Sequence, residues 1–221
     1  MNTLATAPLA PLLDRLFDED AAMSPATNPA LAALSRDERE RLMRSKTDYL
    51  AFYGQLKDLP LSVSRETGSL LYMLARGCRA RSIVEFGTSI GISTLHLAAA
   101  LRDNGGGRVI GSEFEPSKLA RARDNLAASG LADLVELREG DALQTLATGL
   151  PDAIDLLLLD GAKALYPEIL ALVQSRLRPG AFVVADNADY SPEYLALVRA
   201  PGSGYLSVPF ADDVELSMRL G

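Results

Sequence analysis

The sequence predicts an α/β fold built on a seven-stranded, mostly parallel sheet, and three observations carry this prediction. From Arg81 onward, short strand-like runs alternate with helical segments, as in successive βαβ units. Continuous apolar runs such as 156–159 indicate parallel strands covered on both faces. After Asn187 one more helix is expected at 192–199, and two final strand-like runs joined by an acidic turn at 211–213 predict an antiparallel hairpin.

The predicted elements of the α/β part follow one another without long interruptions. In order, they are SIVEF, GISTLHLAAAL, RVIGSEF, PSKLARARDNLAASG, VELRE, ALQTLA, AIDLLLLD, ALYPEILALVQSRL, AFVVADN, the helix at 192–199, GYLSVPF and VELSMRL. Pro116 begins the second helix and Gly130 ends it, since proline suits a first turn and glycine accepts the left-handed conformation after a last one. Five parallel strands and a hairpin differ from the six parallel strands of a plain dinucleotide-binding fold.

The part of the chain before Ala80 lacks strand-like runs and predicts extra helices ahead of the sheet. Ser35 with Glu38 forms a capping-box pattern. Apolar and aromatic residues recur at helical spacing after it, so we expect one helix from Ser35 to just before Pro60. A second helix is expected over 64–78.

Length and composition favour one domain over residues 1–221, because α/β domains commonly exceed about 200 residues. Within it we distinguish a helical region, 1–79, from a core that carries the ligand sites, 80–221. The N-terminal helices are expected either to cover an acceptor pocket or to form the interface of a homodimer. Residues 1–10 are expected to lack ordered structure.

Charge and cysteine content narrow the function classes. A net charge of -7 and a pI near 4.8 argue against a nucleic-acid partner, which basic clusters would bind. Cys78 is the single cysteine, so an internal disulfide and a multi-cysteine metal cage are excluded. No apolar run reaches the roughly 20 residues of a membrane span, and no secretory signal is evident. We expect a soluble cytoplasmic protein that acts on a small molecule.

A glycine-containing loop follows the first strand and is the strongest local signal. VEFGTSIGIST, residues 84–94, places Gly87 and Gly91 between a strand and its helix. In open α/β sheets this position is a ligand-binding loop. The spacing differs from the G-x-G-x-x-G of dinucleotide sites, and a tight structural turn explains the loop equally well by itself.

Three acidic residues indicate that the ligand at this loop is a nucleoside cofactor. Glu113 ends the second strand 22 residues after Gly91, where an acid accepts hydrogen bonds from ribose hydroxyls. Glu85 adds a negative charge that suits a cationic cofactor, which favours S-adenosylmethionine over NAD; capping a helix or pairing with an arginine is its alternative role. Asp141 lies where adenine would be contacted and also fits the N-cap of the next helix.

A second constellation predicts a metal site. Asp160, Asp186 and Asn187 follow the fourth and fifth strands, which we expect to be neighbours. Their oxygens suit Mg²⁺, with Ca²⁺ or Mn²⁺ as alternatives, although a single acid at a strand end is commonly a loop cap. Lys163 is close enough to serve as a general base if its pKa is lowered; otherwise it is a solvated lysine. His96 is interpreted as a packing or surface residue.

The motifs around these residues resemble those of the cation-dependent O-methyltransferases, the family of the catechol and caffeoyl-coenzyme A enzymes. The resemblance covers about 61–217 and implies a Rossmann-like class I methyltransferase fold. It implies that Glu85, Ser93 and Gly87 hold the methionine end of S-adenosylmethionine. LSVSRETG resembles a segment whose backbone near Val63 and Ser64 also touches the cofactor.

The same resemblance implies roles for the remaining motifs. Glu113 matches the ribose-binding acid and Asp141 the position at adenine. LLLLDGAK and VVADN match the metal motifs, so Asp160, Asp186 and Asn187 are implied as ligands. Lys163 and Asp160 are implied as catalytic, with Asp160 also near the cofactor.

The expected reaction is methyl transfer to a hydroxyl of a small molecule. A vicinal diphenol fits this geometry best, because two adjacent oxygens can share one divalent cation. A nicotinamide-dependent oxidoreductase and a non-catalytic cofactor-binding protein are the alternatives. The chain has no Trp, and its loops at 189–191 and 211–213 match no acceptor-recognition pattern.

Overall fold

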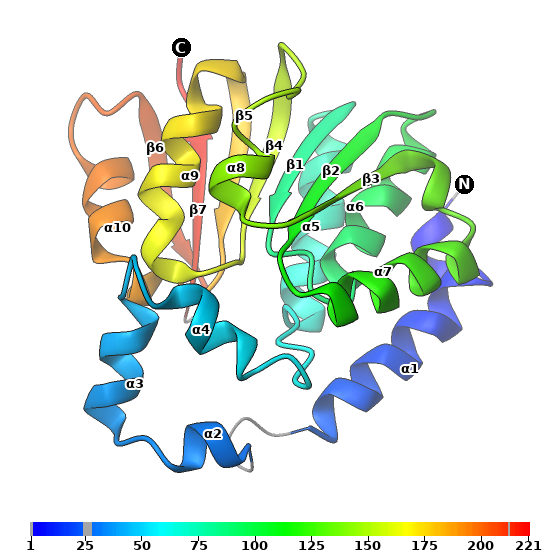
Figure 1. Ribbon diagram of the computed structural model, residues 1–221. Helices are drawn as coiled ribbons and strands as arrows, with labels where there is room; N and C mark the ends of the chain where they lie inside the picture. Colours follow the sequence, from blue (N-terminus) through cyan, green and yellow to red (C-terminus); the bar gives the residue numbers. More distant parts are fainter. Residues whose placement is uncertain (1, 24–27, 212) are drawn as a thin grey trace.

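The computed structural model describes residues 2–23, 28–211 and 213–221 and contains one seven-stranded sheet in the order β3-β2-β1-β4-β5-β7-β6 (Figure 1). The strands are β1 (Ser82–Phe86), β2 (Arg108–Glu113), β3 (Val135–Glu139), β4 (Ile154–Leu159), β5 (Leu177–Ala185), β6 (Tyr205–Phe210) and β7 (Val214–Arg219). Strands β1 to β5 pair in parallel, and β7 pairs antiparallel with both β5 and β6. This confirms the predicted fold class and the closing hairpin; Asp212, in the predicted turn, lies outside the described residues.

Strands β4 and β5 are neighbours, as expected, and their register positions the residues that follow them. Leu159 pairs with Ala185 at the ends of the two strands. The next residues, Asp160 and Asp186, therefore leave the sheet side by side at its carboxyl edge.

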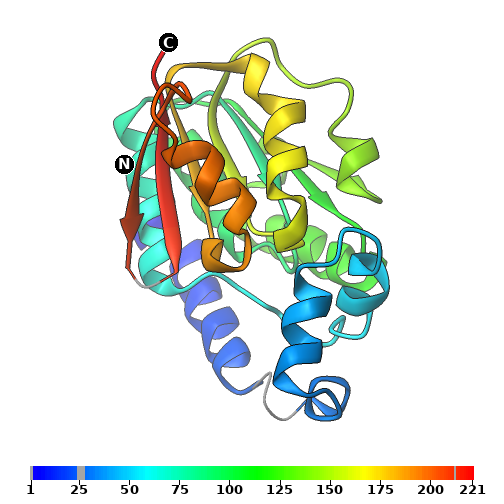
Figure 2. The same cartoon turned by 90° about the vertical axis from the view of Figure 1, so that its left-hand side faces the viewer.

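Helices cover both faces of the sheet (Figures 1 and 2). They are α1 (Leu9–Ala21), α2 (Pro29–Ala32), α3 (Arg36–Met43), α4 (Tyr49–Gly54), α5 (Arg65–Gly77), α6 (Ile92–Asp103), α7 (Pro116–Ser129), α8 (Ala142–Thr145), α9 (Tyr166–Val173) and α10 (Pro192–Arg199). Helices α1, α5, α6 and α7 pack into one core cluster, and α8, α9 and α10 pack into another on the opposite face.

The alternation of side chains along β4 shows why its apolar run is continuous. Leu156 and Leu158 pack into the cluster on one face, and Leu157 and Leu159 pack into the cluster on the other. All four are fully buried, and burial of one leucine stabilises the fold by about 1.5–3 kcal/mol. A parallel strand between two helical layers has no solvent-facing side, so apolar residues fill both of its faces over 156–159.

The N-terminal region differs from its prediction in two ways. The expected helix from Ser35 is broken into α3 and α4, although its capping box is present. The hydroxyl of Ser45 accepts hydrogen bonds from the backbone N–H groups of Thr47 and Asp48, and such local bonds compete with helix continuation. Residues 2–10 are ordered, contrary to expectation: Leu9 begins α1 and is fully buried. Met1 lies outside the described residues.

Helices α2, α3 and α4 lie along the carboxyl edge of the parallel strands (Figures 1 and 2). Lys46, between α3 and α4, forms ion pairs with Glu168 of α9 and Glu193 of α10 at 2.7 and 2.6 Å. Phe52 of α4 packs with Leu31, Leu56 and Leu59 in a small third cluster. Helices α2, α3 and α4, within residues 29–54, therefore cover the edge where ligands bind in open α/β sheets. We call them the N-terminal roof.

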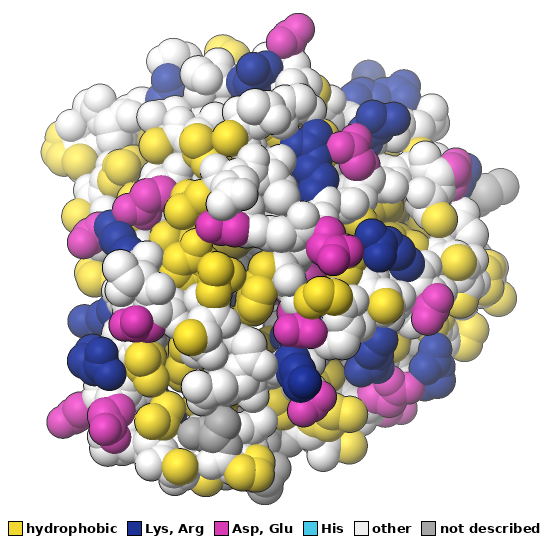
Figure 3. Space-filling model, viewed as in Figure 1, with side chains coloured by type: hydrophobic (Ala, Val, Ile, Leu, Met, Phe, Trp, Pro, Cys, Tyr) yellow, Lys and Arg dark blue, Asp and Glu magenta, His cyan; other side chains and the backbone are white. Residues whose placement is uncertain are grey.

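On the face shown in Figure 3, acidic and basic side chains are interspersed instead of gathered in fields of one sign. Among the described residues, no helix combines the length and the apolar character that a membrane crossing requires.

Candidate functional site

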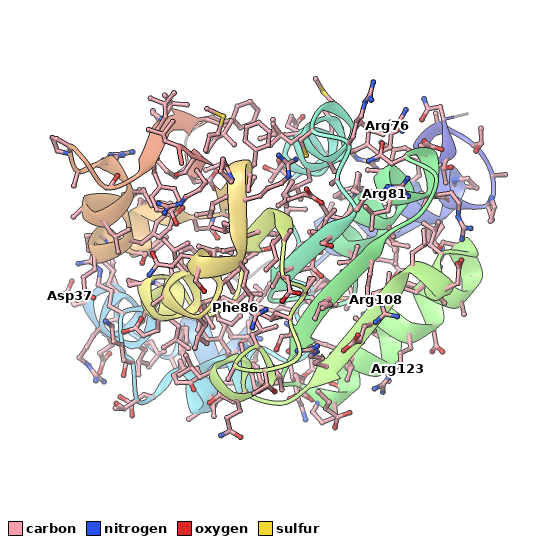
Figure 4. The ribbon with its side chains drawn as sticks, turned by 90° about the horizontal axis from the view of Figure 1, so that it is seen from above. Asp37, Arg76, Arg81, Phe86, Arg108 and Arg123 are labelled. Carbon is pink, nitrogen blue, oxygen red and sulfur yellow. The ribbon has the colours of Figure 1, made fainter. Side chains whose placement is uncertain are left out.

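Two cavities meet at the carboxyl edge of the sheet. The larger, about 910 Å³, lies between the ends of β4 and β5 and the N-terminal roof; Lys163, Asp186 and Asn187 line it. The smaller, about 70 Å³, lies beside the end of β1, where Phe86 stands near the middle of the molecule in Figure 4. Asp160 lines both cavities, so groups bound in the two would meet at its carboxylate.

Besides Asp160, the smaller cavity gathers three residues predicted to bind the cofactor. Gly87, Glu113 and Asp141 line it, although they come from three different loops. Val63 lines the larger cavity instead and is buried, while Ser64 is the N-cap of α5.

Gly87 combines a conformational and a packing requirement for glycine. Its φ is +96°, in the region that side chains disfavour. A Cβ atom there would lie 2.6 Å from the carbonyl oxygen of Asp160. The loop after β1 therefore packs directly on the loop after β4, which supports a structural role for this glycine alongside the predicted ligand role.

Glu85 is fully buried within a cluster of hydroxyl groups. Its carboxylate accepts hydrogen bonds from Thr88 (2.9 Å), Ser93 (2.7 Å) and Thr94 (2.5 Å). Burial raises the pKa of Glu85 to about 7, and the three hydroxyls oppose this rise. The carboxyl neither caps a helix nor pairs with an arginine; it and Ser93 form a polar cluster beneath the glycine loop.

Glu113 faces the smaller cavity from the end of β2. One carboxylate oxygen accepts from the N–H of Ser89 at 2.8 Å and the other from the N–H of Glu115 at 2.9 Å. The side chain is 7% exposed. These bonds hold it in one orientation, and each oxygen retains a second acceptor site for a ligand hydroxyl.

Asp141 performs its predicted capping role and has a further partner that the sequence did not reveal. One oxygen accepts from the N–H of Leu143 at 3.0 Å, at the start of α8. The other accepts from the hydroxyl of Tyr49 at 2.8 Å. Tyr49 belongs to α4, so the N-terminal roof reaches the position where adenine is expected.

Asp160, Lys163 and Asp186 form a buried charged group. The Lys163 ammonium donates to Asp160 at 2.7 Å, and Lys163 is 5% exposed. Burial alone would lower the pKa of Lys163, but the charge of Asp160 outweighs it and holds this pKa well above its usual value. This contradicts the expected lowered pKa, and it also excludes a solvated surface lysine.

The negative charges of Asp160 and Asp186 are both destabilised, since burial raises the pKa of each carboxyl. Burial and the neighbouring charge of Asp160 raise the pKa of Asp186 to about 7. Two carboxyls this close, opposed by one ammonium, leave negative charge that a cation would neutralise.

The donor set fits a hard cation. Asn187 has a left-handed backbone (φ 47°), and its amide donates to Asp213 at 2.9 Å, so that Asp213 adds a carboxylate to the rim of the larger cavity. Within the described ranges, no three His, Cys, Asp or Glu residues form a metal-binding group by themselves. A cation here would therefore need the Asn187 oxygen or ligand oxygens beside Asp160 and Asp186.

Several lining residues were missed by sequence reasoning. Tyr49, Tyr53, Lys118 and Asp213 reach the site from α4, α7 and the hairpin turn. None follows a strand of the parallel sheet, which was the signal used for the predicted residues. His96, by contrast, is a packing residue as expected: it is 3% exposed, and its ring leaves no space for a Cβ atom at Gly68.

The chain is similar to known methyltransferases. The family described as "Methyltransferase domain" matches residues 84–188. The chain is 36% identical over 130 residues to a catechol O-methyltransferase of Niastella koreensis and 37% identical over 131 residues to one of Mycobacterium tuberculosis. These matches cover 58% and 59% of this chain and the same shares of the two relatives, less than two thirds of their length.

A solved structure extends the similarity to nearly the whole fold. The O-methyltransferase TomG of Streptomyces achromogenes, solved in complex with SAM, superposes with a TM-score of 0.64 and 27% identity. The superposition covers 86% of this chain and 92% of TomG.

Proposed function

We propose that this chain, which belongs to the cation-dependent O-methyltransferase family and has the class I methyltransferase fold, methylates a hydroxyl oxygen of a small molecule with S-adenosylmethionine as donor. The observation that carries the proposal is the position of Asp160. It lines both the cavity that contains Gly87, Glu113 and Asp141 and the cavity that contains Asp186 and Asn187. A sulfonium in one cavity and a hydroxyl in the other would meet beside it, and direct transfer mainly requires such positioning.

The chain's own residues divide the work between the two cavities. Glu113 would hold the ribose hydroxyls and Asp141 the adenine edge, while Glu85, Ser93, Gly87 and the backbone at Val63 would surround the methionine end. Asp160, Asp186 and Asn187 would hold a divalent cation, Mg²⁺ in the first place, which would supply charge neutralisation and acidify the acceptor hydroxyl.

Lys163 would act as the general base. Its amine lies in the larger cavity, 2.7 Å from Asp160, within reach of a hydroxyl held there. The ion pair with Asp160 raises its pKa and keeps it protonated, so the base role requires that the ammonium first release a proton to solvent. Neutralisation of Asp160 by a divalent cation would weaken the ion pair and favour this release. Asp160 therefore both holds the amine in position and raises its pKa.

A vicinal diphenol is the acceptor class that we propose. The two adjacent oxygens of such an acceptor could complete the coordination of a cation that Asp160, Asp186 and Asn187 hold only in part. The apolar walls of the larger cavity, including Phe52 and Leu56, suit an aromatic ring. We further propose a cytoplasmic enzyme acting on small molecules, as a homodimer.

Titration calorimetry and a methyl-transfer assay test the proposal. We expect binding of S-adenosylmethionine but not NAD, and turnover with a panel of vicinal diphenols that a chelator abolishes and Mg²⁺ restores. Asp160→Ala should abolish turnover and leave S-adenosylmethionine affinity within a few-fold. Cofactor binding without turnover on any vicinal diol would support a binding protein, and NAD binding would support an oxidoreductase.

A further inference from the structure

Lys118 is a buried lysine at the smaller cavity that none of the roles above uses. It lies in the first turn of α7, is 7% exposed, and lines the cavity together with Glu113 and Asp160. Among the described residues it is the one lysine or arginine that does so. Lys118 therefore borders the space assigned to the cofactor.

The Lys118 ammonium lacks a direct partner within the described part of the chain. It forms no hydrogen bond there and has no carboxylate oxygen within 4.0 Å, in contrast to Lys163, which lies 2.7 Å from Asp160. Burial disfavours its charged form, while Glu113, Asp160, Glu115 and Asp20 favour that form from farther away. A buried charge without a direct partner is costly, so the site is arranged to receive an anionic group.

The charges of S-adenosylmethionine identify that group. The cofactor carries two cationic groups, an ammonium and a sulfonium, and one anion, its α-carboxylate. The acidic residues of the site complement the cations, while Lys118 supplies the cation that a carboxylate needs. We propose that Lys118 binds the α-carboxylate of S-adenosylmethionine and thereby selects donors that retain it. This inference rests on the proposed function, because it takes the smaller cavity as the cofactor site.

Decarboxylated S-adenosylmethionine provides the matched probe, since it keeps the adenosine, sulfonium and ammonium and lacks the carboxylate. Calorimetry would measure the Kd of both compounds for the unaltered chain and for Lys118→Met, Lys118→Arg and Lys57→Met. Lys57 is exposed and lines neither cavity, so Lys57→Met controls for loss of a positive charge. A thermal melt of each variant verifies that it is folded.

We expect Lys118→Met to weaken S-adenosylmethionine binding about tenfold or more, the size of a charge-assisted hydrogen bond, and to change binding of the decarboxylated analogue less than twofold. Lys118→Arg should restore most of the loss, and Lys57→Met should change neither Kd. Equal weakening of both compounds, or no weakening, overturns the inference and leaves the proposed function intact. If the unaltered chain binds neither compound, the proposed function falls with it.

Discussion

The hydroxyl of Tyr49 donates a 2.8 Å hydrogen bond to Asp141, and this bond joins the N-terminal roof to the wall of the smaller cavity. Leu50 and Tyr53 of the same helix also line that cavity. At about 70 Å³ it is too small for a whole nucleoside cofactor, since ligand pockets of drug size measure roughly 300–1,000 Å³. We therefore expect helix α4 to shift when the cofactor enters.

Tyr49→Phe should accelerate cofactor binding. The substitution removes the hydroxyl that donates to Asp141. The lost hydrogen bond contributes about 1 kcal/mol, so the association rate for S-adenosylmethionine should rise several-fold. Surface plasmon resonance would measure it. Tyr72→Phe is the matched control: Tyr72 donates to Asp103 at 2.6 Å but lines neither cavity, and its loss should leave the rate unchanged. A slower rate in Tyr49→Phe would contradict a gating role.

Gly87→Ala should destabilise the fold and abolish cofactor binding. The alanine Cβ would lie 2.6 Å from the backbone of Asp160, so two loops must separate, and the positive φ adds about 1–2 kcal/mol. We expect a total loss above about 3 kcal/mol in urea unfolding. Gly202→Ala has a φ of +76° and no atom within 4 Å of the new Cβ, so its loss should stay near the backbone cost alone. Similar losses in both variants would show that the loop contact contributes little.

Glu85 should make stability depend on pH. Its folded pKa of about 7 lies above the ordinary value of 4.5, so the folded chain keeps a proton that the unfolded chain releases between these pH values. The free energy of unfolding should therefore fall by about 1–3 kcal/mol as the pH rises from 4.5 to 7. Glu85→Gln should remove this part of the dependence, as urea unfolding at pH 5 and 7 would measure. An unchanged profile in the variant would mean that Glu85 stays ionised.

Lys163→Met should increase the effect of divalent cations on stability. Without the ammonium, Asp160 and Asp186 lose the charge that opposes theirs, which costs about 3–5 kcal/mol for a broken buried pair. The rise in Tm on adding Mg²⁺ should then exceed that of the unaltered chain. Lys57→Met again serves as the control. A Tm that does not respond to Mg²⁺ in either protein would count against the proposed metal site.

The core strands were predictable from the sequence because their burial on both faces requires runs of apolar residues. A parallel strand between two helical layers is mostly apolar on both sides, so the sequence of β4 shows the continuous run Leu156–Leu159. The residues after each strand could then be assigned to one edge of the sheet. Asp160 and Asp186 lie side by side there, as that reasoning predicted. The capping box at Ser35 was likewise read correctly, since its two bonds are local.

By itself, the sequence determined the order of strands and helices, the carboxyl edge as the place of the candidate site, and the acids at the ends of β2, β4 and β5. The tertiary structure decided what surrounds them. Tyr49 reaches Asp141 across 92 positions, and Lys118 turns toward the cavity from within a helix. Such contacts depend on how whole helices pack, which no local spacing encodes. The charge state of Lys163 was decided in the same way, because burial and Asp160 act on it in opposite directions and their balance depends on three-dimensional distance.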